Sequence, residues 1–293
     1  MNKIWSILFG VVAFLGFALF VIAPIVGWWL PKDISTFGGE VDFLFYMILA
    51  ITAFFYVLTE AILVYNMYRF EGQAGRKAPF VHGSHRLEVL WTAVPAVILV
   101  IIAVSQISAW ERIKYQKNMP APNGETQQME VSARQWEWRI RYPNVGRIED
   151  WQKTPDHAKD FGASPHQDDI HLVNQVHVYQ GQKVLVHLKT RDVIHSFFLP
   201  NLRLKQDALP GKTIPVWFEV DNKQDNHNVE FDEKTGKLKE LEGRNWELAC
   251  AEYCGTRHSM MRGRLYVHKD KAEYLKWLRH VEKEQRRTNI SAP

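Results

Sequence analysis

The stretch EVLWTAVPAVILVIIAVSQISAW, from Glu88 to Trp110, marks a change in character along the chain. It is the last of three long apolar runs, and the sequence after it is polar with short alternating segments. The chain has 293 residues, of which 46% are hydrophobic, and this length suits one to two domains. We therefore predict a membrane part that ends near Trp110 and a soluble domain that follows it.

Two further apolar runs precede this stretch. They are IWSILFGVVAFLGFALFVIAPIVGWWL, Ile4 to Leu30, and VDFLFYMILAITAFFYVLTEAILVYNMY, Val41 to Tyr68. Each run meets the roughly 20 apolar residues that a helix needs to cross a bilayer. Lipid offers the backbone no hydrogen-bond partner, so a helix is the open-ended element that can span it. We predict a transmembrane helical hairpin over residues 41–110 and one extra N-terminal helix within residues 1–40.

The first run could instead be a signal peptide that is removed. Its apolar core is longer than the about 7–15 residues of such a peptide, and no clear cleavage site of small residues follows it. We therefore favour a retained helix.

Basic residues in the short loops set the predicted orientation. The loop between the first and second runs carries one, Lys32. The loop between the second and third runs carries four: Arg69, Arg76, Lys77 and Arg86. Short loops rich in Lys and Arg remain in the cytoplasm, so the domain after Trp110 is predicted to be extracytoplasmic.

Two carboxylates belong to the membrane part. Glu60 lies inside the second run, where a carboxylate is costly and indicates a proton path or a polar partner. We favour a partner on another subunit, or a side chain that reaches towards the interface. Glu88 lies at the start of the third run, where the helix dipole favours a negative charge.

From about Gln128 the sequence predicts short strands. The strand-like pieces are MEVSARQWEWRIRYP, IHLVNQVHVYQGQKVLVHLKT, TIPVWFEV, RNWELACAEYC and GRLYVHK. The second piece reads as two strands joined around Gly181. This spacing, with turn signals such as LPGK between the pieces, predicts an antiparallel all-β sandwich or Greek-key barrel over residues 111–270.

The rest of the soluble part is less regular. Segments 144–169 and 222–243 lack apolar periodicity and are predicted to be exposed loops, and residues 271–293 are predicted to form a C-terminal helix and tail. Carboxylates in the two loops are interpreted as solvated surface rather than as a docking field for a basic protein: Glu149, Asp150, Asp168, Asp169, Glu230, Asp232 and Glu233. The net charge of +4 is small for this length, and no motif of basic residues interleaved with aromatic residues is seen in the sequence. The sequence therefore gives no indication of a nucleic-acid partner.

The segment CAEYCGTRHSMM holds the only two cysteines of the chain, Cys250 and Cys254. A short loop between two strands can direct both sulfurs to one point. His258 and Met261 follow, and His195 in DVIHSFFLP is a further candidate. Thiolate, imidazole and thioether together are soft ligands that suit copper.

A disulfide and a zinc site are the alternatives. An extracytoplasmic domain permits a disulfide, but that would leave His258 and Met261 without a role. Zinc takes cysteine and histidine, but methionine is a poor zinc ligand. Neither cysteine lies in the C-x-x-C-H pattern of covalent haem attachment, so the sequence predicts no covalently attached haem.

Four segments of this sequence resemble cytochrome c oxidase subunit II. CAEYCGTRHSMM is similar to the copper loop of that family, C-x-E-x-C-G-x-x-H-x-x-M, and DVIHSFFLPNLRLKQDALPG resembles its upstream histidine segment. RQWEWRIRYP resembles its aromatic motif Q-W-x-W, and EVLWTAVPAVIL its second core helix. The resemblance extends from about Val41 to His268 and departs in the extra N-terminal run.

The resemblance implies a cupredoxin-like sandwich that holds a binuclear copper centre, copper A. By position its ligands would be the side chains of five residues and one main-chain carbonyl: His195, Cys250, Cys254, His258, Met261 and the carbonyl of Glu252. The Glu252 carboxylate resembles the one that reaches a Mg2+ or Mn2+ ion shared with subunit I. Oxygen ligands suit such an ion.

Two further roles follow from the resemblance alone. Trp136 resembles the tryptophan through which electrons enter from docked cytochrome c, although by itself it reads as a core aromatic on an alternating strand. Glu88 resembles the carboxylate at the entrance of a proton channel into subunit I.

The resemblance also implies a function and partners. Such a subunit lies in the bacterial inner membrane with its C-terminal domain on the periplasmic side. It contacts subunit I, and subunit III is a further partner. It accepts electrons from cytochrome c or another respiratory donor and passes them to the haem of subunit I, where O2 is reduced and protons are translocated. A free-standing copper A module needs neither the helices nor Glu88, and a quinol oxidase subunit lacks the copper ligands, so we favour neither.

Overall fold

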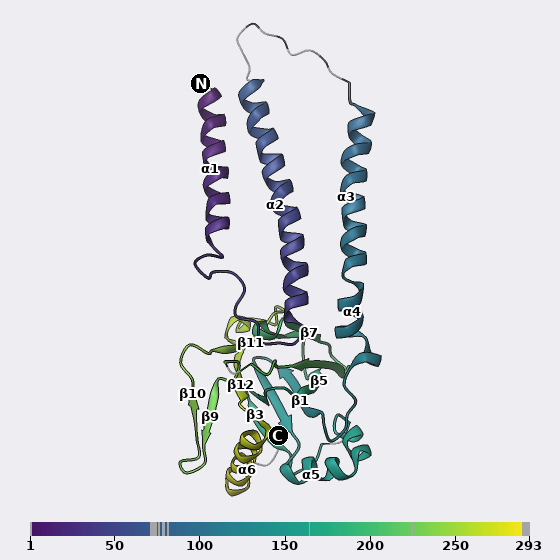
Figure 1. Ribbon diagram of the computed structural model, residues 1–293, viewed down its shortest axis with the longest axis vertical. Helices are drawn as coiled ribbons and strands as arrows, with labels where there is room; N and C mark the ends of the chain where they lie inside the picture. Colours follow the sequence, from purple (N-terminus) through teal and green to yellow (C-terminus); the bar gives the residue numbers. More distant parts are fainter. Residues whose placement is uncertain are drawn as a thin grey trace. The chain divides into compact units, whose positions relative to one another are not determined.

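The computed structural model describes residues 2–70, 75, 77, 80, 82–163, 165–223 and 225–288, with the backbone alone for residue 2 (Figure 1). Arg76 and the last five residues of the predicted tail lie outside the described residues. Two compact units make up the chain. One is Met1–Pro31 with Glu40–Ala109, and the other is Lys32–Gly39 with Trp110–Pro293.

The membrane unit contains the three predicted spanning helices. They are α1 (Asn2–Ile22), α2 (Gly38–Arg69) and α3 (His85–Ser105), which a short break at Gln106 separates from α4 (Ile107–Lys114). All three are long and apolar enough to cross a membrane. Pro95 lies inside α3 without ending it. The prediction of a hairpin with one extra N-terminal helix is confirmed.

The extra helix packs on α2 through a glycine. A Cβ atom added at Gly10 would lie 3.3 Å from Cγ1 of Val64, so the absence of a side chain permits a close approach of the two helices. The Lys3 ammonium lies 4.9 Å from the ring centroid of Tyr68.

Glu60 lines a groove of about 510 Å³ between α1 and α2, and its Oε2 accepts no hydrogen bond from any residue that the structure describes.

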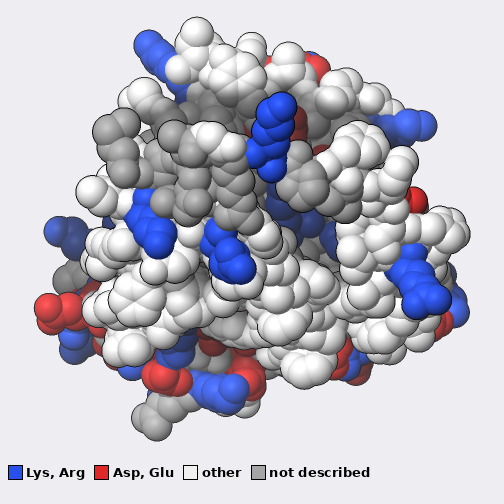
Figure 2. Space-filling view, turned by 90° about the horizontal axis from the view of Figure 1, so that it is seen from above, with Lys and Arg blue, Asp and Glu red and all other residues white. Residues whose placement is uncertain are grey.

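Exposed basic side chains mark the start of α1 and the connection between α2 and α3: Lys3, Arg69, Lys77 and Arg86. In Figure 2, Lys and Arg side chains are spread over a mostly uncharged surface. Arg69, Lys77 and Arg86 are three of the four loop residues on which the predicted orientation depends.

The soluble unit is built on two five-stranded sheets. The first has the order β3-β2-β1-β5-β8 and the second the order β4-β12-β11-β6-β7. Their bounds are β1 (Gln127–Arg134), β2 (Glu137–Tyr142), β3 (Ile170–Val173), β4 (Gln175–Tyr179), β5 (Lys183–Thr190), β6 (His195–Leu199), β7 (Leu204–Ala208), β8 (Ile214–Glu219), β11 (Trp246–Cys250) and β12 (Arg262–His268). The predicted Greek-key sandwich is confirmed. The expectation of wholly antiparallel pairing is wrong, because β1 pairs with β5 and β4 with β12 in parallel.

The segment before Gly181, which was predicted to be one strand, forms two strands, β3 and β4, that are separated by a corner at Asn174. Asn174 has a φ of 57°, a left-handed conformation that asparagine tolerates better than most residues. Its side-chain oxygen accepts a hydrogen bond from the backbone N–H of Trp138 at 2.8 Å, and its carbonyl accepts one from Arg264 at 2.9 Å. The chain therefore leaves the first sheet at the end of β3 and enters the second with β4.

Aromatic rings fill the space between the sheets. Trp138 of β2 and Phe197 of β6 are both fully buried, with ring centroids 5.5 Å apart in an edge-to-face arrangement. Such a pair contributes about 0.5–1.5 kcal/mol beyond the burial of its area. Trp138 also lies 6.2 Å from the ring of His195, so the core directly supports the start of β6.

Segment 144–169 is not an exposed loop. It contains α5 (Val145–Lys153) and the short helix η2 (Pro155–Asp160), and it buries Trp151, Ala158 and Phe161 as a cluster. Asp169, interpreted above as solvated surface, is buried and pairs with Arg141 at 2.5 Å and with Arg147 at 2.6 Å.

Segment 222–243 is also more regular than predicted. It contains a hairpin of β9 (Val229–Asp232) and β10 (Lys237–Glu240). The C-terminal helix α6 (Lys271–Arg287) follows β12 and buries Tyr274, Trp277 and Leu278.

Residues 32–39 pack within the soluble unit rather than forming a free connection. Ile34 donates its backbone N–H to Asn201 at 2.9 Å and accepts from Asp221 at 2.8 Å. Phe37 is buried against the ring of Trp217, with centroids 5.7 Å apart.

Candidate metal centre

Sheet register brings the candidate ligands to one edge. Strand β11 runs antiparallel to β6 and pairs Cys250 with Phe197. The end of β11 therefore lies beside the start of β6, where His195 stands. The loop from residue 251 to residue 261 then returns to β12, and the N–H of Cys250 donates to the carbonyl of Met261 at 3.2 Å.

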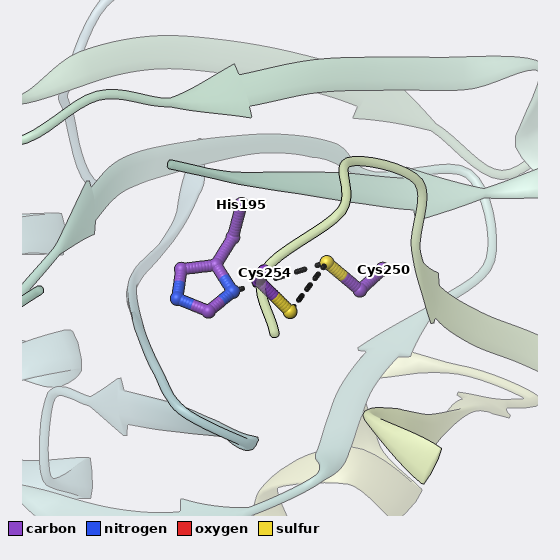
Figure 3. A group of neighbouring side chains, drawn as sticks. All are labelled: His195, Cys250 and Cys254. Atoms are coloured by element: carbon purple, nitrogen blue, oxygen red, sulfur yellow. Dashed lines mark hydrogen bonds between the residues drawn. The ribbon is translucent and has the colours of Figure 1, made fainter. Parts of the chain in front are cut away.

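Two thiols and one imidazole form the centre of this group (Figure 3). The Sγ atoms of Cys250 and Cys254 are 3.9 Å apart, and Nδ1 of His195 lies 3.8 Å from Sγ of Cys250. One ligand atom from each of the three residues lies within 4.8 Å of the others. His195 is fully buried and Cys254 nearly so, whereas Cys250 is partly exposed.

Three further groups surround the sulfurs. Nδ1 of His258 lies 3.5 Å from Sγ of Cys254, and Sδ of the buried Met261 lies 3.9 Å from the same atom. The main-chain carbonyl of Glu252 lies 3.3 Å from Sγ of Cys250. Each sulfur therefore has an imidazole on its own side and a weaker donor beside it.

The cysteines do not form a disulfide. Both are free, and their separation of 3.9 Å is far from the about 2.05 Å of an S–S bond. The thiols are therefore available as ligands.

Asp192 orients His195, and the sequence reasoning assigned it no role. Its Oδ1 lies 2.8 Å from Nε2 of His195, and its Oδ2 accepts a hydrogen bond from the N–H of Gln135 at 2.7 Å. A carboxylate that holds Nε2–H leaves Nδ1 free to bind a metal. The pattern Asp-x-x-His at the start of a strand is the signal that could have revealed this contact.

Electrostatics prepare one thiol for metal binding. Partial burial opposes ionisation of Cys250, but its contact with His195 and the hydrogen bonds around it outweigh burial and lower its pKa to about 6. Burial and the neighbouring Cys250 raise the pKa of Cys254 to about 12. Burial opposes a charge on His195, but Cys250 and Asp192 raise its pKa. Of the two cysteines, Cys250 is therefore the one that ionises more readily.

Trp136 packs on the cysteine loop rather than in the core. It lies in the turn between β1 and β2, and a Cβ atom added at Gly255 would lie 3.3 Å from its Cζ2. Gly255 has a φ of 117°, a conformation that side chains disfavour, so this position suits glycine for two reasons. The Gln135 amide donates to the carbonyl of Cys254 at 2.8 Å. The core reading of Trp136 is wrong, because Trp138 is the fully buried tryptophan of the motif.

The remaining candidates lie elsewhere or point outwards. The Glu252 side chain is exposed, so it can reach a partner. Glu88 belongs to the membrane unit, in the first turn of α3. Its Oε2 lies 3.7 Å from Nδ1 of His85, and both side chains are exposed.

Comparisons with known proteins agree with this arrangement. The family model described as the transmembrane domain of cytochrome c oxidase subunit II matches residues 26–108, and the model of its periplasmic domain matches residues 128–265. The alternative cytochrome c oxidase subunit 2 of Bradyrhizobium diazoefficiens is 26% identical over 258 residues, which cover 86% of this chain and 83% of that protein. Cytochrome c oxidase subunit 2 of Thermostichus vulcanus is 27% identical over 281 residues, which cover 85% and 79%.

The crystal structure of the periplasmic domain of subunit II of cytochrome oxidase from Bradyrhizobium japonicum is 19% identical in sequence and has a TM-score of 0.38. The comparison covers 57% of this chain and 98% of that one.

The two family models together span well over half of the chain and describe a membrane protein with an extracytoplasmic C-terminal domain. Members of this family are parts of haem-copper terminal oxidases. With three spanning helices, a β-sandwich and both family models matched in order, this chain belongs to the cytochrome c oxidase subunit II family.

Proposed function

We propose that this chain binds a binuclear copper A centre, accepts electrons there from cytochrome c or another respiratory donor, and passes them to the haem of subunit I. The observation that carries this proposal is the convergence of five side chains. Two imidazoles and a thioether surround two thiol sulfurs that are 3.9 Å apart. Oxygen reduction and proton translocation then take place in the assembled oxidase.

The chemistry of these donors fits copper better than zinc. Met261 is fully buried with its sulfur towards Cys254, and a thioether is a soft ligand that suits copper. When bound, the copper pair supplies one-electron redox chemistry. The proposed ligands are His195, Cys250, Cys254, His258, Met261 and the carbonyl of Glu252.

The surrounding residues hold these ligands in place. Asp192 fixes the ring of His195 through Nε2, and Gln135 ties the turn that carries Trp136 to the carbonyl of Cys254. Such supporting hydrogen bonds orient metal ligands and tune their basicity. Because the ligands are held before an electron arrives, little rearrangement accompanies its transfer.

Metal analysis of the full chain tests the proposal. Purified in detergent and loaded with copper, the chain is expected to hold two copper ions per molecule and to give the EPR signal of a mixed-valence copper pair. Binding of a single copper with an ordinary mononuclear signal, or a preference for zinc at equal concentrations, would contradict it.

Trp136 is proposed as the residue through which electrons enter. Trp136→Ala is expected to slow reduction of the copper centre by the donor cytochrome and to leave the copper content unchanged, because Trp136 contacts the loop at Gly255 without offering a ligand atom. Stopped-flow reduction of the oxidase measures the rate. Trp136→Phe, which keeps a ring, is the matched control, and unchanged kinetics in Trp136→Ala would remove the role.

Glu88 is proposed to lie at the entrance of a proton path into subunit I. Glu88→Gln is expected to slow turnover of the assembled oxidase and to leave reduction of the copper centre intact, because Glu88 lies in the membrane unit, in the first turn of α3. Oxygen consumption and rapid copper reduction are measured on the same sample. Normal proton-coupled turnover would exclude the role.

The remaining assignments belong to the same proposal. The exposed Glu252 carboxylate is proposed to reach a Mg2+ or Mn2+ ion shared with subunit I. The membrane is proposed to be the bacterial inner membrane, with subunits I and III as partners. The proposed division of the chain is an N-terminal membrane helix within residues 1–40, a transmembrane hairpin over residues 41–110, an extracytoplasmic domain over residues 111–270 and a C-terminal helix and tail over residues 271–293. Residues 32–39 pack with the extracytoplasmic domain.

A further inference from the structure

Two histidines that are not among the proposed copper ligands lie fully buried beneath the C-terminal helix. His177 stands on β4 and His268 at the end of the neighbouring strand β12. Nδ1 of His177 lies 3.1 Å from Nε2 of His268. At this distance one ring donates and the other accepts, so both rings are accommodated in their uncharged forms.

Helix α6 covers this histidine pair with aromatic rings. Trp277 stacks on His177 with centroids 3.8 Å apart and an angle of 12° between the planes, and it lies 5.1 Å from His268. Tyr274 lies 5.7 Å from His268. The contact between α6 and the second sheet therefore depends directly on these two imidazoles.

Few charged groups face the pair. From α6, the Oε1 atom of Glu273 lies 3.7 Å from Nδ1 of His268, beyond hydrogen-bond distance, and the helix cap Asp270 is the other nearby carboxylate. The other titratable neighbours are the phenols Tyr142, Tyr266 and Tyr274. Gln175 Oε1 lies 3.5 Å from Nε2 of His177.

Burial makes protonation of this pair unfavourable. It lowers the pKa of His177 well below the usual range, and the neighbouring His268 lowers it further. Burial also lowers the pKa of His268, although Glu273 acts in the opposite direction. Two imidazolium rings 3.1 Å apart would repel one another, and the nearest carboxylate is already held by the N–H of Phe231 at 2.7 Å.

We propose that His177 and His268 form an acid-released latch that holds α6 on the sandwich. When protons bind to the two rings, the repulsion between them and the burial of their charge oppose docking, and α6 separates from β4 and β12. The latch lies in the extracytoplasmic domain and responds to acidification on that side of the membrane.

Release of α6 also removes the contacts of this helix with the β9–β10 hairpin, which Arg264 and Tyr266 of β12 still hold through Glu240. Glu273 accepts the hydrogen bond from Phe231 of β9, and Lys276 pairs with Glu233 at 3.1 Å. The ring of Phe231 lies 5.5 Å from His280 of α6. The helix and the hairpin are therefore expected to loosen together.

The sign of the pH dependence follows from the lowered pKa values. Above the ordinary histidine pKa of about 6.5 the docked and released states bind the same number of protons, and docking is fully stable. As the pH falls below this value the released state binds more protons, so the equilibrium constant for release rises up to tenfold per pH unit for each histidine, and up to about a hundredfold for both.

Hydrogen exchange measured by mass spectrometry on the full chain in detergent tests the latch. Exchange is followed between pH 7.5 and pH 5.0, with times corrected for the intrinsic rate. Peptides from α6 and the β9–β10 hairpin are expected to lose protection with a slope of one to two protons below about pH 6.5. Peptides from β1 and β11 are expected to keep theirs.

Three variants make the test specific. The double variant His177→Gln/His268→Gln is expected to lose the pH dependence. The single variant His268→Gln, which places an uncharged amide at the site, is expected to lose about one proton of the slope. His157→Gln, at an exposed histidine on η2, is the control and keeps the full slope. Protection of α6 that is independent of pH in the unaltered chain, or an unchanged slope in His268→Gln, would overturn the proposal.

Discussion

Serine in place of Cys254 is expected to abolish the proposed binuclear copper centre and with it the oxidase activity that would depend on that centre. Cys254 lies at the middle of the site, with Cys250, His258 and Met261 all within 3.9 Å of its sulfur. A hydroxyl is a harder ligand that does not ionise at neutral pH, so it could not replace the thiolate that the proposed copper centre would need. Copper content per chain and the EPR signal of the mixed-valence pair measure the loss.

Cys250→Ser is expected to give the same result, because the proposal requires both sulfurs. Ser259→Ala provides the matched control, since Ser259 is an exposed residue of the same loop. Its copper content and EPR signal are expected to match those of the unaltered chain. If either cysteine variant kept the parental mixed-valence signal, the assignment of ligands would be wrong.

Loss of the Asp169 carboxylate is expected to destabilise the soluble unit strongly. Asp169 pairs with two arginines, Arg141 and Arg147, and its side chain is fully buried. Asp169→Ala leaves Arg141, itself nearly buried, with Glu130 as its remaining acidic partner. Removal of one member of a buried ion pair costs about 3–5 kcal/mol. For a unit of this size each kcal/mol lowers Tm by about 2–4 °C, which thermal unfolding of the full chain in detergent can measure.

An exposed ion pair of the same region gives the comparison. Glu149 of α5 pairs with Arg279 of α6 at 3.0 Å, and both side chains are about half exposed. Exposed pairs contribute about 0–1 kcal/mol, so Glu149→Gln is expected to change Tm by only a few degrees. Equal losses in Asp169→Ala and Glu149→Gln would show that the buried pairs do not stabilise the fold as proposed.

The membrane helices could be predicted from sequence because their signal is long and needs no tertiary context. A run of roughly 20 apolar residues has few other uses. The strand predictions succeeded where apolar and polar residues alternate, but they failed at Asn174. The apolar positions keep the same two-residue phase before and after Asn174, so the sequence reads as one strand. Only its φ of 57° and its contacts with β2 and β12 show that the chain changes sheets there.

Segment 144–169 was misread for a different reason. Helix α5 has nine residues, too few for a clear 3.6-residue period, and its buried face depends on a cluster with Phe161 further along the chain. Likewise, a carboxylate such as Asp169 looks the same in sequence whether it is solvated or paired. Its environment is fixed by Arg141, 28 residues earlier.

The candidate ligands were all named from the sequence, because their spacing carries the resemblance. The residues that support them were not. Asp192 and Gln135 act through hydrogen bonds that depend on how two loops meet. Alternation would place both tryptophans of the Q-W-x-W motif on one face of a strand, because they are two residues apart. It fails here because Trp136 lies in the turn before β2, whereas Trp138 lies in the strand and is fully buried.

Ile34 and Phe37 bear on how this domain can be produced as a soluble fragment. Their side chains are almost fully buried, and Ser35 forms a β-bridge with Val220. A fragment that starts after residue 110 would lack both side chains, and each contributes about 1.5–3 kcal/mol of burial. Loss of Phe37 would also expose the ring of Trp217, and an exposed apolar surface promotes self-association. Fusing residues 32–39 to such a fragment through a flexible linker would restore the buried side chains of Ile34 and Phe37.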